Sequence, residues 1–126
     1  MWIFSIYGFY SIACADNPDG SLDCDAVMVR ARCKDHLKNL QARFPELTSS
    51  EIVSWPNRDY RYRLLVPKST WVRALQGMAE EQEWNNFKNE VTKRQGRDGH
   101  AYGSALHDVW EILYLLQESE TRQSRS

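Results

Sequence analysis

The sequence has no marked excess of charge of either sign. Sixteen Lys and Arg residues stand against seventeen Asp and Glu residues, so the formal net charge at pH 7 is -1. A strongly basic nucleic-acid-binding domain is therefore not indicated, because such domains carry a clear surplus of Lys and Arg. A local basic patch is compatible with the balance, and it would have to come from the way the fold groups the charges.

Cysteine is scarce, with only three residues, and none of them has the short paired spacing of a zinc site. We therefore predict no metal, no cofactor and no disulfide framework, and we expect a reducing compartment, the cytoplasm. Cys33 falls at an inward position of a predicted strand and is expected to be buried. Approach of Cys14 and Cys24 across a hairpin is a minor alternative.

Long apolar runs are also lacking. The first fifteen residues end in Ala13-Cys14-Ala15 and imitate a secretory signal, but no Lys or Arg precedes the apolar run. The run is too short for a membrane span. We expect this segment to belong to the folded domain, with no membrane association, and keep a signal segment as the alternative.

What the sequence does contain is a clear order of strands and helices. Period-two alternation predicts strands over residues 2–14 (bent or split at residues 7–8), 27–33, 51–55 and 60–66. Helical spacing of apolar residues predicts a helix over residues 35–44 and a second helix that begins at residue 69 or 70. It also predicts a third helix that ends at residue 96 and a final helix from residue 102. This order predicts an α+β fold with an antiparallel sheet of about four strands, helices mainly on one face and a helical C-terminal half. We predict a single domain over 1–118 and a flexible C-terminal tail over 119–126.

Two of the predicted strands, residues 27–33 and 60–66, alternate arginine with apolar or aromatic residues. Because strand side chains point to opposite faces in turn, Tyr60, Tyr62 and Leu64 are expected in the core and the arginines on the other face. Guanidinium groups bind phosphate and carboxylate and stack on rings. The alternative is that they are solvated or paired with acids of a terminal helix. The four arginines of this candidate ligand-binding set are Arg30, Arg32, Arg61 and Arg63.

A second basic cluster follows in the helical half of the chain. It is more typical of a solvated helix end than of a binding site, because basic residues favour the last turn of a helix. We keep it as a secondary basic patch. Its members are Lys88, Lys93, Arg94 and Arg97.

Candidate catalytic residues are few. His36, His100 and His107 lack metal-ligand spacing and are expected at the surface or as helix caps. No nucleophile motif or glycine-rich phosphate loop is present, so we assign no catalytic residue. Trp71, Trp84 and Trp110 lie on apolar helical stripes and are expected in the core, whereas Trp2 and Trp55, near strand ends, are expected to border a surface. The remaining enzyme hypothesis is an unrecognised site around His100, Tyr102 and His107.

Several short segments resemble a family of small bacterial and phage proteins that has no established activity. The segments are Met1-Trp2-Ile3-Phe4, Gly8-Phe9-Tyr10-Ser11, Val29-Arg30-Ala31-Arg32, Asn86-Phe87-Lys88 and His107-Asp108-Val109-Trp110. The resemblance implies no functional residue; it implies only that the N-terminal stretch is part of the folded domain.

The pattern favours a non-enzymatic binding module whose arginine and aromatic residues contact an anionic partner. That partner is a nucleic acid, a nucleotide or an acidic protein. The first alternative is a protein-interaction or inhibitor module of bacterial or phage origin, which would use the same rings as hot-spot residues. The second is an enzyme with an unrecognised site.

Overall fold

The structure is a computed structural model that describes residues 1–125. The chain forms two compact units, Met1–Glu83 and Trp84–Ser126, which are treated separately below. Elements of the first unit are β1 (Trp2–Phe4), β2 (Phe9–Asp16), β3 (Leu22–Ala31), α1 (Lys34–Arg43), the 3-10 helix η1 (Pro45–Ser49), β4 (Val53–Ser54), β5 (Tyr62–Pro67) and α2 (Lys68–Glu80). Elements of the second are α3 (Phe87–Gln95), the 3-10 helix η2 (Gly96–Gly99) and α4 (His100–Arg125).

The first unit is built on an antiparallel sheet with the strand order β1-β2-β3-β5-β4. The α+β class is confirmed, but the sheet has five strands, whereas the sequence predicted about four. The extra strand arises at the N-terminus, where a turn closed by a 2.9 Å hydrogen bond from Ser5 N to Gly8 O separates β1 from β2. The sequence of residues 2–14 was compatible with one bent strand or with two short strands, and the structure has two.

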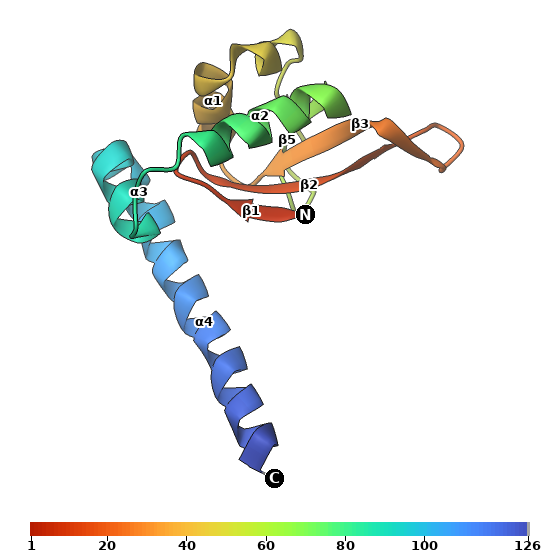
Figure 1. Cartoon of the computed structure of the whole chain (residues 1–126). Coiled ribbons are helices and arrows are strands. Elements are labelled where there is room, and N and C mark those ends of the chain that lie inside the picture. The colour runs from red at the N-terminus through yellow and green to blue at the C-terminus, as the bar shows by residue number, and fades with distance from the viewer. Residues whose placement is uncertain (126) are drawn as a thin grey trace. The chain divides into compact units, whose positions relative to one another are not determined.

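The helices of this unit, α1 and α2, cover one face of the sheet (Figure 1). Alternate strand residues point into the layer between sheet and helices because of the pleat. Packing of large apolar side chains there removes them from water and is the main stabilising contribution. Fully buried members of this core include Tyr10, Val29, Leu37, Leu40 and Leu64.

Two expectations depended on where strands β3 and β5 end, and the one for Cys33 is wrong. β3 ends at Ala31, so Cys33 lies in the bend before α1 and is exposed instead of buried. β5 begins at Tyr62, so the alternation that placed Tyr60 in the core does not extend to it. Tyr62 and Leu64 follow the predicted parity, with Leu64 fully buried.

In the second unit, α3 packs against the beginning of α4. The side chain of Asn86 caps α3 by accepting a 3.1 Å hydrogen bond from Asn89 N. Val91 of α3 and Tyr102 and Leu106 of α4 are buried. Trp110, which the sequence assigned to the core, is 54% exposed.

Helix α4 continues to Arg125 and so includes most of the segment predicted as a flexible tail. The tail and the single domain over 1–118 stay predictions. Residue 126 lies outside the described residues.

Candidate ligand-binding face

The face of the sheet opposite α1 and α2 carries a continuous row of cross-strand neighbours. The register pairs Trp2 with Ser11, Ser11 with Arg30, Arg30 with Arg63, and Arg63 with Val53. Cross-strand partners share a face, so all five side chains lie on one side of the sheet. The row runs from β1 at one edge to β4 at the other, and its two central positions are arginines.

Arg30 and Arg63 are held in place by hydrogen bonds to their surroundings. Arg30 donates from Nη2 to Ser11 Oγ at 2.7 Å and from Nε to Ser11 O at 3.3 Å. Arg63 donates from Nε to Tyr60 O at 3.2 Å, and its Nη2 lies 3.7 Å from Asp59 Oδ1. Because a guanidinium has five N–H donors, both side chains keep donors for a ligand.

Tyr60 lies among these arginines and not in the core. The guanidinium carbons of Arg30 and Arg32 lie 4.9 and 4.6 Å from the centre of its ring. The ring of Phe9 is its aromatic neighbour, at 6.4 Å between centroids. Tyr60 is buried as predicted, but its burial comes from cation–π contacts on the face opposite the helices.

Further aromatic rings extend from this centre to both edges of the sheet. Phe9 stacks on Phe4 at 4.5 Å and meets Trp2 edge-on at 5.8 Å, and Trp2 is 69% exposed. At the other edge, Trp55 lies 5.0 Å from the guanidinium carbon of Arg63 and is also exposed. We call the whole set the arginine/aromatic face. It consists of Trp2, Phe4, Phe9, Arg30, Arg32, Trp55, Arg58, Tyr60 and Arg63.

The electrostatics of this face are those of a positive cluster. The pKa of Arg63 is lowered, first by burial of its side chain and then by the charges of Arg30 and Arg58, with Asp59 acting in the opposite direction. A single carboxylate at 3.7 Å thus offsets only part of the repulsion that Arg63 experiences from its neighbours. An anion placed here would relieve this repulsion.

The structure brings together three of the four predicted arginines. Arg30, Arg32 and Arg63 gather around Tyr60, whereas Arg61 contacts Ser54 Oγ at 3.3 Å and the ring of Tyr62 at 5.4 Å. The role of Arg61 in binding stays a prediction. These contacts do not join it to the other three.

Sequence reasoning did not predict that Arg58 and Trp55 contact each other. Arg58 N donates to Trp55 O at 3.1 Å, and its guanidinium carbon lies 5.7 Å from the Trp55 ring. The sequence analysis assigned no role to Arg58. The available signal was an arginine three residues after a tryptophan, a spacing at which a tight turn brings both side chains together.

Two residues of the secondary basic patch contact other side chains of the second unit. Arg94 donates from Nε to Glu90 Oε1 at 2.7 Å and also lies 5.5 Å from the ring of Trp84. The ammonium of Lys88 lies 5.1 Å from the ring of Trp110. These contacts support the interpretation of a stabilised helix surface, although anion binding by the patch stays a prediction.

The histidines occupy different environments. His36 is buried, contrary to expectation, and its Nδ1 accepts a 3.2 Å hydrogen bond from Phe9 N. Burial lowers the pKa of His36, while the charge of Asp35 opposes this shift. His107 is exposed and lies 3.2 Å from Glu111 Oε1. Within residues 1–125, no group of three His, Cys, Asp or Glu side chains is arranged to hold a metal.

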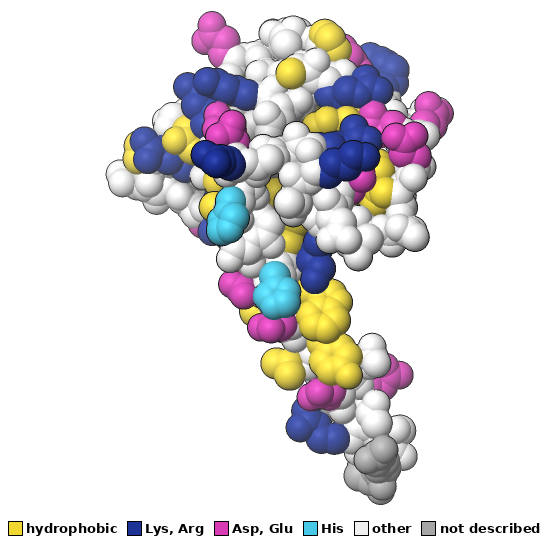
Figure 2. Space-filling model, turned by 90° about the vertical axis from the view of Figure 1, so that its left-hand side faces the viewer, with side chains coloured by type: hydrophobic (Ala, Val, Ile, Leu, Met, Phe, Trp, Pro, Cys, Tyr) yellow, Lys and Arg dark blue, Asp and Glu magenta, His cyan; other side chains and the backbone are white. Residues whose placement is uncertain are grey.

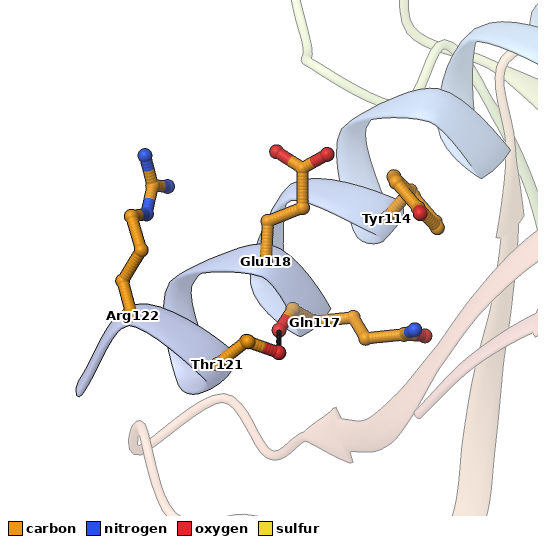
Figure 3. Close-up of a pocket in the computed structure, with 5 residues that line it drawn as sticks. All are labelled: Tyr114, Gln117, Glu118, Thr121 and Arg122. Atoms are coloured by element: carbon orange, nitrogen blue, oxygen red, sulfur yellow. Dashed lines mark hydrogen bonds between the residues drawn. The ribbon is translucent and has the colours of Figure 1, made fainter. Parts of the chain in front are cut away.

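A shallow hollow at the end of α4 does not provide a site. Its lining residues are Tyr114, Gln117, Glu118, Thr121 and Arg122 (Figure 3). All belong to successive turns of one helix, and Thr121 Oγ1 donates to Gln117 O at 3.1 Å. One helix cannot enclose a ligand, and the hollow contains neither His100, Tyr102 nor His107.

The far part of α4 exposes many large apolar side chains (Figure 2). The rings of Trp110 and Tyr114 stack on one another at 5.6 Å along its surface. Such a concentration of exposed apolar residues is unusual for a monomer and typical of an interaction surface. The exposed members are Trp110, Ile112, Leu113, Tyr114, Leu115 and Leu116.

Comparison with known proteins identifies no relative: no family model, curated protein or solved structure matches the chain. The resemblance to small bacterial and phage proteins gains no support from this and carries no argument below. Across residues 1–125, no helix combines the length and the apolar character needed to cross a membrane.

Proposed function

We propose that this protein is a non-enzymatic binding module whose arginine/aromatic face binds an anionic partner, and that the partner is a single-stranded nucleic acid. The observation that carries the proposal is the cross-strand row with Arg30 and Arg63 at its centre, which has the exposed Trp2 at one end and the exposed Trp55 against Arg63 at the other. Bases stack on aromatic rings and phosphates bind guanidinium groups, so a single strand uses both parts of this row.

The spacing of the rings favours a strand over a mononucleotide. Trp2 lies on β1, and Trp55 directly follows β4, with its N–H bonded to Arg61 O at 2.7 Å. Four inter-strand steps of about 4.8 Å separate these edges, or roughly 19 Å. One nucleotide would contact one ring and its neighbouring arginine, whereas a short single strand would contact both edges and the arginines between them.

The test uses exposed residues, so that loss of binding does not reflect loss of the fold. Trp2→Ala removes one stacking platform and should weaken binding of a labelled single-stranded oligonucleotide by about 1–3 kcal/mol in fluorescence anisotropy. Arg32→Ala, which removes an exposed guanidinium above Tyr60, should also weaken it. The matched control is Arg73→Ala, an exposed arginine on α2, which should bind as the unmodified protein does.

Absence of binding by the unmodified protein at low salt would end the nucleic-acid proposal. Binding of an acidic peptide with the same dependence on Arg32 would instead identify an acidic protein as the partner. Equal losses from Arg32→Ala and Arg73→Ala would mean that general charge, and not this face, governs binding.

A second candidate function, protein interaction, is favoured by α4. Val109, Leu113 and Leu116 follow the three-and-four spacing of a coiled-coil seam, and the last two are more than half exposed. Such a seam is complementary to another apolar helix, and the α4 of a second copy supplies one. In sedimentation velocity the unmodified protein should then be a dimer and Leu113→Glu with Leu116→Glu a monomer, while Gln117→Glu, which adds charge beside the seam, should remain dimeric.

The third hypothesis, an enzyme with an unrecognised site, is supported by none of the contacts described above. Cytoplasmic localisation stays a prediction from cysteine usage.

A further inference from the structure

Two of the three cysteines lie next to each other in the β2–β3 hairpin. Cys14 is paired with Val27, whereas the next residue, Ala15, is paired with Asp23. The register therefore shifts between Cys14 and Ala15, and β3 contributes the extra residues, beginning with Cys24. The pairs Asp16 with Leu22 and Ala15 with Asp23, continued by one residue, set Cys24 of β3 opposite Cys14 of β2 at this bulge.

The two thiols are close enough to influence each other. Interaction with the thiol of Cys14 is the largest of the causes that raise the pKa of Cys24, followed by the charge of Cys14 and by burial. Lys68, at the start of α2, acts in the opposite direction, and Asp23 adds to the rise. Both residues are free thiols in the structure, and Cys24 is exposed while Cys14 is half-buried.

We propose that Cys14 and Cys24 form a reversible disulfide across the β2–β3 hairpin, so that this end of the sheet is a site of thiol–disulfide exchange with small-molecule disulfides such as oxidised glutathione. The observations that carry it are the register that sets Cys24 opposite Cys14 at the bulge, the free state of both thiols and the access of Cys24 to solvent. The inference is independent of ligand binding by the arginine/aromatic face.

The exchange balances in two steps. One protein thiolate attacks a sulfur of oxidised glutathione, forms a mixed disulfide and releases one glutathione as its thiolate. The second protein thiol loses its proton to solvent and attacks the mixed disulfide, which forms the Cys14–Cys24 bond and releases the second glutathione. The two protein thiols are oxidised, and one glutathione disulfide is reduced to two thiols.

Cys33 provides an internal comparison. It follows the far end of β3, which extends from Leu22 to Ala31, and it is exposed. At about 3.3 Å per residue, the length of the strand separates it from Cys24 by far more than the 4.4–6.8 Å that a disulfide allows between Cα atoms. Under oxidation Cys33 should therefore form only a mixed disulfide with glutathione.

The experiment equilibrates the full chain with mixtures of reduced and oxidised glutathione, traps free thiols with iodoacetamide and measures intact mass and peptide maps. Two of the three alkylatable thiols should be lost together, with the mass of two hydrogens, and should return on reduction. Cys33→Ser should form the same Cys14–Cys24 bond. Cys14→Ser should lose it and carry glutathione on Cys24.

The proposal is overturned if Cys14 and Cys24 of the unmodified protein are alkylated independently at every glutathione ratio. It is overturned equally if Cys24 is recovered only as a glutathione adduct or in a bond between two chains. Both outcomes are measured on the unmodified protein, so they do not depend on the folding of a variant.

Discussion

Gly8 occupies a position at which the fold leaves no room for a side chain. A Cβ atom there would lie 2.3 Å from Cγ of His36, which is buried against the turn between β1 and β2. His36 cannot move away easily, because its Nδ1 accepts the hydrogen bond from Phe9 N and its carbonyl accepts one from Tyr10 Oη at 2.6 Å. The close approach of this turn to α1 therefore requires glycine.

Gly8→Ala should lower the free energy of unfolding by about 1–3 kcal/mol, the usual cost of forcing extra atoms into a packed site. Gly103→Ala in α4 is the matched control, since its added Cβ would meet only Thr92 Oγ1 at an ordinary 3.9 Å. It should be neutral or stabilising by up to about 1 kcal/mol, because alanine is the better helix former. Urea unfolding measures both; an unaffected Gly8→Ala would contradict the packing of His36.

His36 should make stability depend on pH just below neutrality. Burial lowers its pKa in the folded state below its usual value near 6.5, so the unfolded chain binds the proton more readily. The folded state should therefore keep its full stability above about pH 6.5 and lose stability as the pH falls toward the lowered pKa. Urea unfolding between pH 7.5 and pH 5.5 should show this loss in the unmodified protein and a smaller one in His36→Gln.

The control for this experiment is His107→Gln. His107 is exposed, and its imidazole lies against Glu111 and Trp110 of α4. Its replacement should leave the pH dependence unchanged. An equal effect of the two substitutions would show that the slope has another origin.

At the scale of elements, helix α4 is longer than α3, the helix that packs against it. α4 has 26 residues and α3 has nine, which correspond to about 39 and 14 Å. Leu106 lies where α3 covers α4 and is buried, whereas Leu116 of the same stripe is 67% exposed. The sequence predicted Trp110 in the core because periodicity describes the helix and not the length of its neighbour.

Leu106→Ala should therefore destabilise the second unit by about 2–5 kcal/mol, through lost burial and the cavity that remains. Leu116→Ala should change stability by no more than about 0.5 kcal/mol, as expected of a surface substitution. Thermal unfolding followed by far-UV circular dichroism, at protein concentrations low enough to keep the chain monomeric, distinguishes them. Similar losses from both would mean that the far part of α4 is covered.

The candidate face shows the same distinction between local pattern and packing. Period-two alternation correctly placed Arg30 and Arg63 opposite the core, since their pairing partners in the middle of the sheet share that face. It does not account for the burial of Tyr60, which was predicted but lies before the first residue of β5. There the turn before the strand, and the two guanidinium groups above the ring, decide where the side chain lies.

For the whole molecule, near-neutral net charge conceals a separation of charge within the first unit. Acidic residues collect in the β2–β3 hairpin, where Asp16, Asp23 and Asp25 lie, whereas Arg30 and Arg63 occupy the other end of the paired strands. A ligand near the arginines experiences their local charge more than the distant acids, which are screened beyond about 10 Å at 0.1 M salt.

Binding of a single strand should thus fall as salt rises. With three arginines neutralising phosphates, a plot of log K against log salt should have a slope of about −2, from roughly −0.7 per contact. Arg32→Ala should make the slope about 0.7 less negative. Anisotropy titrations over a range of NaCl concentrations measure it, and a slope near zero would instead indicate apolar recognition.

The sequence by itself determined the α+β class, most of the strands and helices, and the side of the sheet on which Arg30 and Arg63 lie. These features follow from periodicity and turn residues, which act between near neighbours in the chain. Only the tertiary structure decided the burial of His36, the position of Tyr60 beneath two guanidinium groups and the exposure of the far part of α4. Each of these depends on which distant segment packs against the residue, and how far that segment extends, and no local pattern encodes either.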